Sequence, residues 1–544
     1  MLYLYFYLIS FSLVGYGFIL SKIIKIESSN FGLLGLMGLT LLCFISFLTS
    51  LFFKHGIWFN SFFISFGIIV LIFNLRRFYE IKKEFFTHSI VFLILFLFIS
   101  VAKNHDDFPY YHFPYAYLLT EFAHPIGIGQ FNNGFRSPSS IFFLSSMFYL
   151  PKISFYLLHT LPAFILGFSN IILLRKIFDK KTFDNLKIIN FLSLFCFIFI
   201  NIFFYRLAEH GTDRSGMILI MLSIIYLIIL TSNIVDIDNK DLSNLKIFSI
   251  LICFIISLKP YYLINLPFFL ILLFYEQSRK NLLRLLFSPV FFYCLFFLIF
   301  TTFYTFINSS CLVFPLTFTC FENVSWSVGK SHINDVKIWF ELWSKGGASP
   351  NYVVDNKINY IEGFNWLSNW INIYFFNKVS DFLLGLVFLS LVIYFTYRSK
   401  LIENKTYDNK INIIYLFLVI IFIEWFYKHP SLRYGGYHII ALLFFIPISL
   451  RLNNFSIDYK DFYKRTTIII LITLSIFIAR NLDRLNNESK LYKYNVFVDP
   501  NFKFIGMNKK SYFRYNEQIK KNIKNYNEIN FFGIKFLKIT RKKK

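Results

Sequence analysis

The strongest constraint on the fold is a long series of apolar stretches of about 17 to 25 residues, the length that crosses a bilayer as a helix. Hydrophobic residues make up 56% of the chain and charged residues only 16%. The sequence therefore predicts an all-α polytopic membrane protein with about 13–14 transmembrane helices. We expect spans near 3–22, 32–53, 57–75, 88–103, 152–174, 187–205, 215–231, 246–258, 262–276, 284–306, 378–397, 411–427, 436–450 and 466–480. The spans 246–258 and 262–276 are short and joined at Lys259-Pro260, so they form either a re-entrant pair or one broken helix.

The positively charged residues indicate how these spans are oriented. Basic side chains cluster in alternate loops, which we assign to the cytoplasm. Because membrane proteins carry basic residues in cytoplasmic loops to set their orientation, the formal net charge of +25 does not require a nucleic-acid partner. The first span lacks a basic leader and a small-residue cleavage site, so we expect a retained helix. The remaining loops then face outward. They hold His, Asp, Arg and Trp, which predicts that the active face is extracytoplasmic.

The same pattern divides the chain into five parts. Residues 1–87 form N-terminal transmembrane helices, and residues 88–306 form a transmembrane core with an acidic outer loop at 104–137. Residues 307–377 form an extracytoplasmic segment, and residues 378–480 form the C-terminal transmembrane helices. Residues 481–544 form a small polar appendage, expected outside, with short apolar pieces at 494–498 and 529–539 that favour strands.

The acidic outer loop contains the most chemically suggestive residues. Asp106 and Asp107 lie among aromatic and imidazole side chains directly after a predicted span. A partly desolvated carboxylate at this position can act as a general base towards a hydroxyl group. Neighbouring side chains on a helix diverge by about 100°, so one Asp would face the cavity and the other would hold a helix end or Arg136. The alternative is that both Asp residues cap a short helix within an interfacial aromatic belt.

A second outer loop, 206–214, is rich in ionisable residues. Glu209 and His210 are candidate ligands for substrate, and with Asp213 they also suggest a metal site. Their spacing matches no zinc signature, so we expect no metal. The simpler interpretation is a hydrated turn in which Thr212 or Asp213 caps the next helix.

Several cationic residues are candidates for binding phosphate. Arginine binds phosphate oxygens through two parallel hydrogen bonds, and an ionisable residue near membrane depth, such as Lys259, suggests a function unless it snorkels to the surface. In the loop 428–438, glycines would let the backbone approach a ligand, although an ordinary tight turn is the alternative. The candidate substrate-binding residues are His112, Arg136, Glu209, His210, Arg214, Lys259, Lys330, Arg433 and His438.

The long outer segment, residues 307–377, is distinguished by its tryptophan and cysteine residues. It holds five of the seven tryptophans, which would suit either a sugar-stacking surface or anchoring at the membrane interface. We expect helices near 334–344 and 363–374. Cys311 and Cys320 would face an oxidising compartment and could pair, although the sequence does not establish the geometry.

Together these motifs resemble the GT-C superfamily of membrane glycosyltransferases. The resemblance rests on Asp106 to His112 in the first substantial outer loop, an interfacial helix after it, many spans and a late outer segment. The chain is also similar to uncharacterised bacterial multi-pass proteins that share a D-D-x-x-x-Y-H segment, a later N-x-x-x-R (Asn132 to Arg136) and an outer W-S-V-x-K (Trp326 to Lys330). The resemblance implies Asp106 or Asp107 as the catalytic base and a sugar on a polyprenyl phosphate as the donor.

The implied reaction is an inverting transfer to a glycan, lipid or protein acceptor. Cationic side chains would stabilise the leaving lipid phosphate, so no metal or other cofactor is required. Two rival classes stay open. An O-antigen-type polysaccharide polymerase or ligase also combines many spans with a large outer loop, and a transporter would show ionisable residues near mid-span and repeated broken helices.

Overall fold

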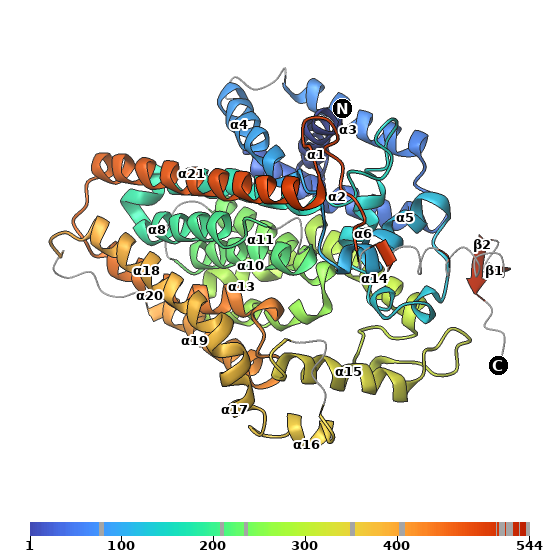
Figure 1. Cartoon of the computed structure of the whole chain (residues 1–544). Helices are drawn as coiled ribbons and strands as arrows, with labels where there is room; N and C mark the ends of the chain where they lie inside the picture. The colour runs from blue at the N-terminus through green and yellow to red at the C-terminus, as the bar shows by residue number, and fades with distance from the viewer. Residues whose placement is uncertain are drawn as a thin grey trace.

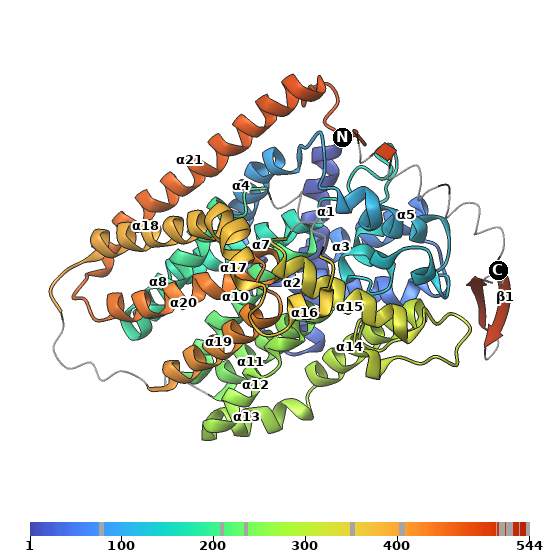
Figure 2. The same cartoon turned by 60° about the horizontal axis from the view of Figure 1, so that its bottom comes forward.

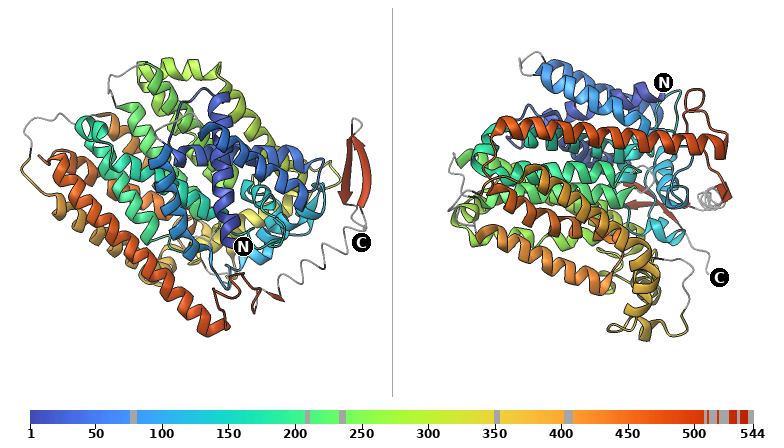
Figure 3. Two further views of the ribbon diagram at one scale, coloured as in Figure 1. Left: turned by 90° about the horizontal axis from the view of Figure 1, so that it is seen from above. Right: turned by 60° about the vertical axis from the view of Figure 1, so that its left-hand side comes forward.

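The computed structural model describes residues 1–75, 81–206, 211–232, 238–348, 354–401, 409–506, 509–510, 517, 526–531 and 534–539. Within these residues, ten helices are long and apolar enough to cross a membrane. The prediction of an all-α polytopic membrane protein is confirmed. Long helices packed side by side form the body of the protein (Figure 1), and the right-hand view of Figure 3 shows α21 running alongside the others.

The N-terminal helices pack through glycines. They are α1 (Leu2–Ile23), α2 (Phe31–Ser50), α3 (Ile57–Leu75) and α4 (Ile81–Ile99). A Cβ on Gly17 would lie 1.9 Å from the carbonyl oxygen of Leu34, and one on Gly15 would lie 1.8 Å from that of Gly67. The small residues therefore let α1 approach α2 and α3 at backbone contact, as is usual in membrane bundles.

The acidic loop folds into short helical pieces before the core helices begin. These pieces are η1 (Phe108–His112), α5 (Phe113–Glu121), η2 (Ile128–Gln130), η3 (Asn133–Phe135) and α6 (Ser140–Ser146). The core helices that follow are α7 (Leu161–Ile177), α8 (Lys180–Ile202), α10 (Thr212–Thr231) and α11 (Asp238–Leu258). The span expected from residue 152 begins only at 161, because Lys152 and Ser154 adopt positive φ and place turns there.

The chain after α11 departs most from the expected spans. It forms η4 (Pro260–Asn265), α12 (Phe268–Ile271), η5 (Leu272–Phe274), α13 (Glu276–Leu286) and α14 (Pro289–Ser309). The single span expected at 262–276 is instead a series of short turns of helix. Pro260 and Pro267 each lack a backbone N–H, which prevents a continuous helix. The span expected from residue 284 begins at Pro289.

The outer segment and the last helices complete the chain. They are η6 (Thr317–Thr319), α15 (Lys330–Lys345), α16 (Lys357–Ile361), α17 (Leu367–Trp370), η7 (Ile371–Val379), α18 (Ser380–Tyr397), α19 (Asn409–Lys428), η8 (Leu432–Tyr434), α20 (Gly436–Asn453) and α21 (Tyr459–Tyr492). In Figure 2, where the bottom of Figure 1 comes forward, α15 and α16 lie in front of other helices of the bundle. A disulfide joins Cys311 to Cys320, which answers the question that the sequence left open.

The appendage after α21 contains a pair of strands. β1 (Tyr526–Phe531) pairs antiparallel with β2 (Ile534–Ile539), as the apolar piece at 529–539 indicated. The other apolar piece, 494–498, forms turns rather than a strand. α21 is also longer than the expected span at 466–480, with 34 residues.

Candidate functional site

Four charged side chains from distant parts of the chain meet at one end of the helix bundle. Arg433 is central: its Nε donates to Oδ2 of Asp213 at 2.8 Å, and its Nη2 donates to Oδ2 of Asp107. Lys259 donates from Nζ to Oδ1 of Asp213. We call Asp107, Asp213, Lys259 and Arg433 the charge cluster. With two carboxylates and two cations, it is formally neutral.

Helix ends bring these residues together. Asp107 directly precedes η1, and Asp213 lies in the first turn of α10. Lys259 lies between the end of α11 and Pro260, and Arg433 belongs to η8, just before α20. Polar groups at helix ends escape the apolar interior of the bundle, so charged side chains from separate helices can gather there.

Two glycines make this arrangement possible. Gly211 precedes α10 with φ of 56°, and a Cβ there would lie only 2.8 Å from Cε1 of His112. Gly435 follows η8 with φ of 103°, which turns the chain from Arg433 into α20. Both positions require the left-handed conformations that glycine adopts without strain.

The charge cluster is buried on one side and open on the other. The side chain of Asp213 is 3% exposed, whereas those of Asp107, Lys259 and Arg433 are 25%, 31% and 33% exposed. Asp213 therefore forms the base of the cluster. The other three side chains are accessible to a molecule arriving from the open side.

Opposing effects set the ionisation of the outer pair. Burial raises the pKa of Asp107, but Arg433, His105 and His112 lower it, and the net pKa lies below the ordinary value. Burial lowers the pKa of the Arg433 guanidinium, but Asp213 and Asp107 raise it, and the net value lies well above the ordinary one. The pair is fully ionised at neutral pH.

Two imidazoles lie beside Asp107. Nδ1 of His105 lies 3.5 Å from Oδ2 of Asp107 and accepts its backbone N–H at 3.1 Å. Burial lowers the pKa of His112 to about 4, although Asp107 opposes the shift. His112 is therefore a neutral imidazole at pH 7, able to donate or accept one hydrogen bond without adding charge.

Aromatic rings line the Lys259 side of the charge cluster. Nζ of Lys259 lies 4.8 Å from the ring centroid of Tyr434, and that ring lies 5.2 Å from the ring of Trp343 on α15. The hydroxyl group of Tyr262 donates to the backbone oxygen of Asp213 at 2.6 Å. The outer segment thus contributes Trp343, which packs against the aromatic ring that lies beside Lys259.

Asp106 occupies a different environment from Asp107. Its side chain is 68% exposed, and its only described ionic partner is Lys103, at 3.4 Å. Adjacent carboxylates on a helical turn diverge, as the sequence suggested. The structure directs Asp107 into the charge cluster and leaves Asp106 at the surface.

Other predicted residues have described partners outside the charge cluster. Nε of Arg136 donates to the backbone oxygen of Gly129 at 3.0 Å, within its own loop. Arg214 lies over the rings of Phe204 and Tyr437, 5.2 and 5.7 Å from their centroids.

The remaining predicted residues are also placed elsewhere or are not described. Lys330 begins α15 and lies 3.8 Å from Glu322, and His438 is buried within α20. Glu209 and His210 lie outside the described residues. Among the residues that the structure describes, no group of three or more His, Cys, Asp or Glu side chains could hold a metal ion.

Asp213 is the member of the charge cluster that the sequence did not identify as a binding residue. The prediction that Thr212 or Asp213 caps α10 is wrong, because the N-cap residue is Gly211, which has no side chain to bond the first amides of the helix. The available signal was the concentration of ionised residues in the loop 206–214. A carboxylate in such a loop can equally pair with distant cations.

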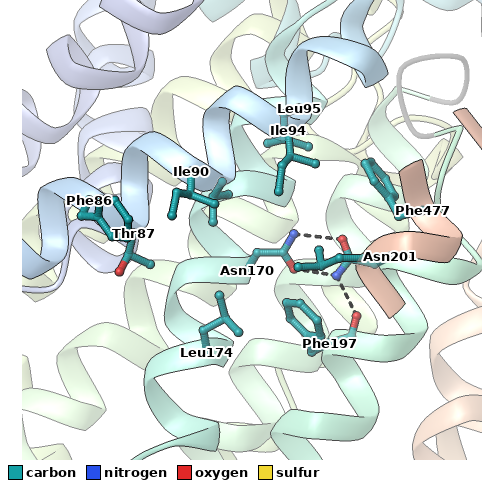
Figure 4. A pocket seen from close by; sticks show the side chains of 12 residues that line it. Phe86, Thr87, Ile90, Ile94, Leu95, Asn170, Leu174, Phe197, Asn201 and Phe477 are labelled. Atoms are coloured by element: carbon teal, nitrogen blue, oxygen red, sulfur yellow. Dashed lines mark hydrogen bonds between the residues drawn. The ribbon is translucent and has the colours of Figure 1, made fainter. Parts of the chain in front are cut away.

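A well-defined cavity lies away from the charge cluster. It has a volume of about 220 Å³ and an almost wholly apolar wall between α4, α7, α8 and α21 (Figure 4). The amides of Asn170 and Asn201 satisfy each other across this wall, at 3.0 and 2.8 Å. No polar chemistry is offered to a ligand there, so the charge cluster is the stronger candidate site.

Comparison with known proteins assigns a family. No curated protein and no solved structure matches the chain. A family model described as a domain of unknown function (DUF8201) matches residues 1–440, which include all four residues of the charge cluster. The chain therefore belongs to the DUF8201 family.

Proposed function

We propose that this protein is a metal-independent membrane glycosyltransferase of the GT-C type. It moves a sugar from a polyprenyl-phosphate donor to a glycan, lipid or protein acceptor, with inversion at the anomeric carbon. The observation that carries the proposal is the pairing of Asp107 with Arg433 on the open side of the charge cluster. One carboxylate able to accept a proton thus lies directly beside one guanidinium able to bind phosphate.

The proposed reaction is a single displacement. The acceptor hydroxyl oxygen attacks the anomeric carbon and forms the new glycosidic bond, while Asp107 takes the hydroxyl proton. The bond between the anomeric carbon and the phosphate oxygen breaks, and its electron pair leaves with the lipid phosphate. The leaving phosphate gains a negative charge, which Arg433 and Lys259 stabilise electrostatically.

Arg433 also controls the strength of the base. While the guanidinium holds Asp107, the pKa of this carboxyl is lowered and it is a weak proton acceptor. When a donor phosphate takes over hydrogen bonds from Arg433, the carboxylate loses part of that stabilisation and its pKa rises. The base then becomes effective only when the donor is bound. Asp213 retains Arg433 through Nε during this exchange.

The proposed location is the extracytoplasmic face of a bacterial inner membrane. The alternation of basic loops supports this orientation. The disulfide between Cys311 and Cys320 also supports it, because disulfides persist in oxidising compartments. α15 belongs to the same outer segment and brings Trp343 to the aromatic rings beside Lys259.

The function is tested by supplying membranes that contain the protein with two radiolabelled donors. One is a monosaccharide on a polyprenyl phosphate, and the other is an oligosaccharide on a polyprenyl pyrophosphate. The proposal predicts transfer of one sugar from the first donor only, with an inverted anomeric configuration in the product. Transfer of a whole glycan from the second donor would support a polymerase or ligase. Release of intact donor on the opposite face of sealed vesicles would support a transporter.

A further inference from the structure

The end of α21 is bonded to the chain that leads into the acidic loop. Nη2 of Arg484 donates to the backbone oxygens of Leu97 and Ser100, both at 3.0 Å. Glu488 accepts the backbone N–H of Ala102 at 2.8 Å and pairs with Arg484 at 3.0 Å. Arg484 and Glu488 are both buried. Such a charged pair, with its hydrogen bonds satisfied, fixes geometry rather than serving as a loose surface contact.

The chain that follows α21 bonds to Ala102 a second time. Lys493 ends α21 in the left-handed conformation, which reverses the chain direction. The backbone N–H of Lys503 donates to the backbone oxygen of Ala102 at 2.7 Å. The amide and the carbonyl of Ala102 are therefore both bonded by the C-terminal part of the chain. We call residues 493–506 the C-terminal strap.

An aromatic side chain of the strap packs against the residue next to Asp107. Phe502 is buried, and its ring centroid lies 5.2 Å from that of Phe108 and 5.2 Å from that of His159. Phe504 makes a similar contact with Phe113, at 5.2 Å. Edge-to-face contacts of this kind fix the relative orientation of the rings.

We propose that the C-terminal strap positions Asp107 for its role at the charge cluster. Lys503 of the strap and Glu488 of α21 hold the backbone at Ala102, before Asp107, and the ring of Phe502 packs against the side chain of Phe108, directly after it. These contacts limit movement of the carboxylate relative to Arg433. Phe502 and Glu488 are positioning residues in this proposal. They lie beyond residues 1–440, the part matched by the family model, whereas Asp107 lies within it.

A second phenylalanine of the strap, Phe497, provides a matched control for substitution of Phe502. Phe497 is 93% exposed, whereas Phe502 is 3% exposed. Phe502→Ala and Phe497→Ala make the same chemical change in the same segment, but only the first removes contacts with the acidic loop. Phe502→Leu keeps an apolar side chain, and it is the second variant should Phe502→Ala fail to fold.

The test is hydrogen exchange measured by mass spectrometry on the full-length protein in detergent. We expect the amides of residues 103–112 to exchange about tenfold faster in Phe502→Ala, and less so in Phe502→Leu, because local opening of the loop becomes easier. Phe497→Ala should match the wild type, and peptides from α10 and α20 should be unchanged in every variant. Unchanged exchange at 103–112, or faster exchange throughout the protein, would overturn the proposal.

A second readout connects the strap to the proposed function, on which the catalytic part of this inference rests. In the transfer assay, Phe502→Ala should lower kcat about tenfold with little change in the donor KM, because the base is displaced while the donor-binding cations remain. A raised KM with unchanged kcat would contradict positioning of the base. If no variant and no wild-type sample transfers sugar, the proposed function fails, but hydrogen exchange still decides whether the strap holds the loop.

Discussion

Replacing Asp213 with Asn tests whether the charge cluster holds together the helix ends that contribute its four residues. Asp213 is almost fully buried and accepts hydrogen bonds from two cations. Hydrogen bonds to charged groups contribute about 1.5–3 kcal/mol each, which gives an upper bound of about 3–6 kcal/mol for the two bonds. Asn keeps one neutral acceptor, and water reaches the partly exposed Lys259 and Arg433. We therefore expect a loss of about 2–3 kcal/mol in the free energy of unfolding.

The assay is equilibrium unfolding in mixed detergent micelles, combined with a double-mutant cycle using Lys259→Met. A coupling energy of about 1 kcal/mol or more between Asp213 and Lys259 is expected for directly bonded residues. Asp106→Asn is the control, and it should change stability by less than about 0.5 kcal/mol because this residue is exposed. A similarly small effect of Asp213→Asn, or a coupling energy near zero, would refute the reasoning.

Three further predictions follow from the same contacts. In Arg433→Gln, the acid limb of the pH–rate profile should move to higher pH, because the lowered pKa of Asp107 depends on the guanidinium, and an unmoved limb would contradict the pairing. The stability that this pair contributes in the wild type is present above the ordinary carboxyl pKa of about 3.9 and is lost as the pH falls through the lowered pKa of Asp107. Replacing Cys311 and Cys320 with Ser should cost about 2–3 kcal/mol for so short a loop, and the wild-type cysteines should resist alkylation in intact cells until reduced. Asn60→Ala should cost about 1–3 kcal/mol in micelle unfolding, because the two N–H groups of its buried amide are shared among three backbone carbonyls within hydrogen-bonding distance. A neutral result would mean that water replaces the amide.

The sequence predicted the class of fold well because the length of an apolar run is a local property. Most expected spans correspond to helices of the structure. Errors arose where local chemistry interrupts an apolar run, as at Pro267, or where positive φ at Lys152 and Ser154 delays a helix, whereas the break at Lys259-Pro260 lies where the sequence placed it. Neither interruption makes its segment less apolar, so the pattern of apolar residues cannot detect it.

The candidate site was only partly predictable. Asp107, Lys259 and Arg433 were candidates from their residue types and from their places at the ends of spans. Their partnership with Asp213 was not predictable, because Arg433 and Asp213 are 220 residues apart and tertiary packing decides which helix ends meet. The distinction between Asp106 and Asp107 likewise depends on the direction in which one short helix starts.

The central claim is that Asp107 is the catalytic base, and the most direct test compares Asp107→Asn with Asp106→Asn. The measurement is the rate of sugar transfer from a polyprenyl-phosphate donor, in membranes with matched expression of each variant. General base catalysis typically contributes about 10²–10⁴-fold, so we predict a loss of that size for Asp107→Asn and a rate within about twofold of the wild type for the exposed Asp106→Asn. Equal rates for the two variants, or a loss confined to Asp106→Asn, would contradict the assignment.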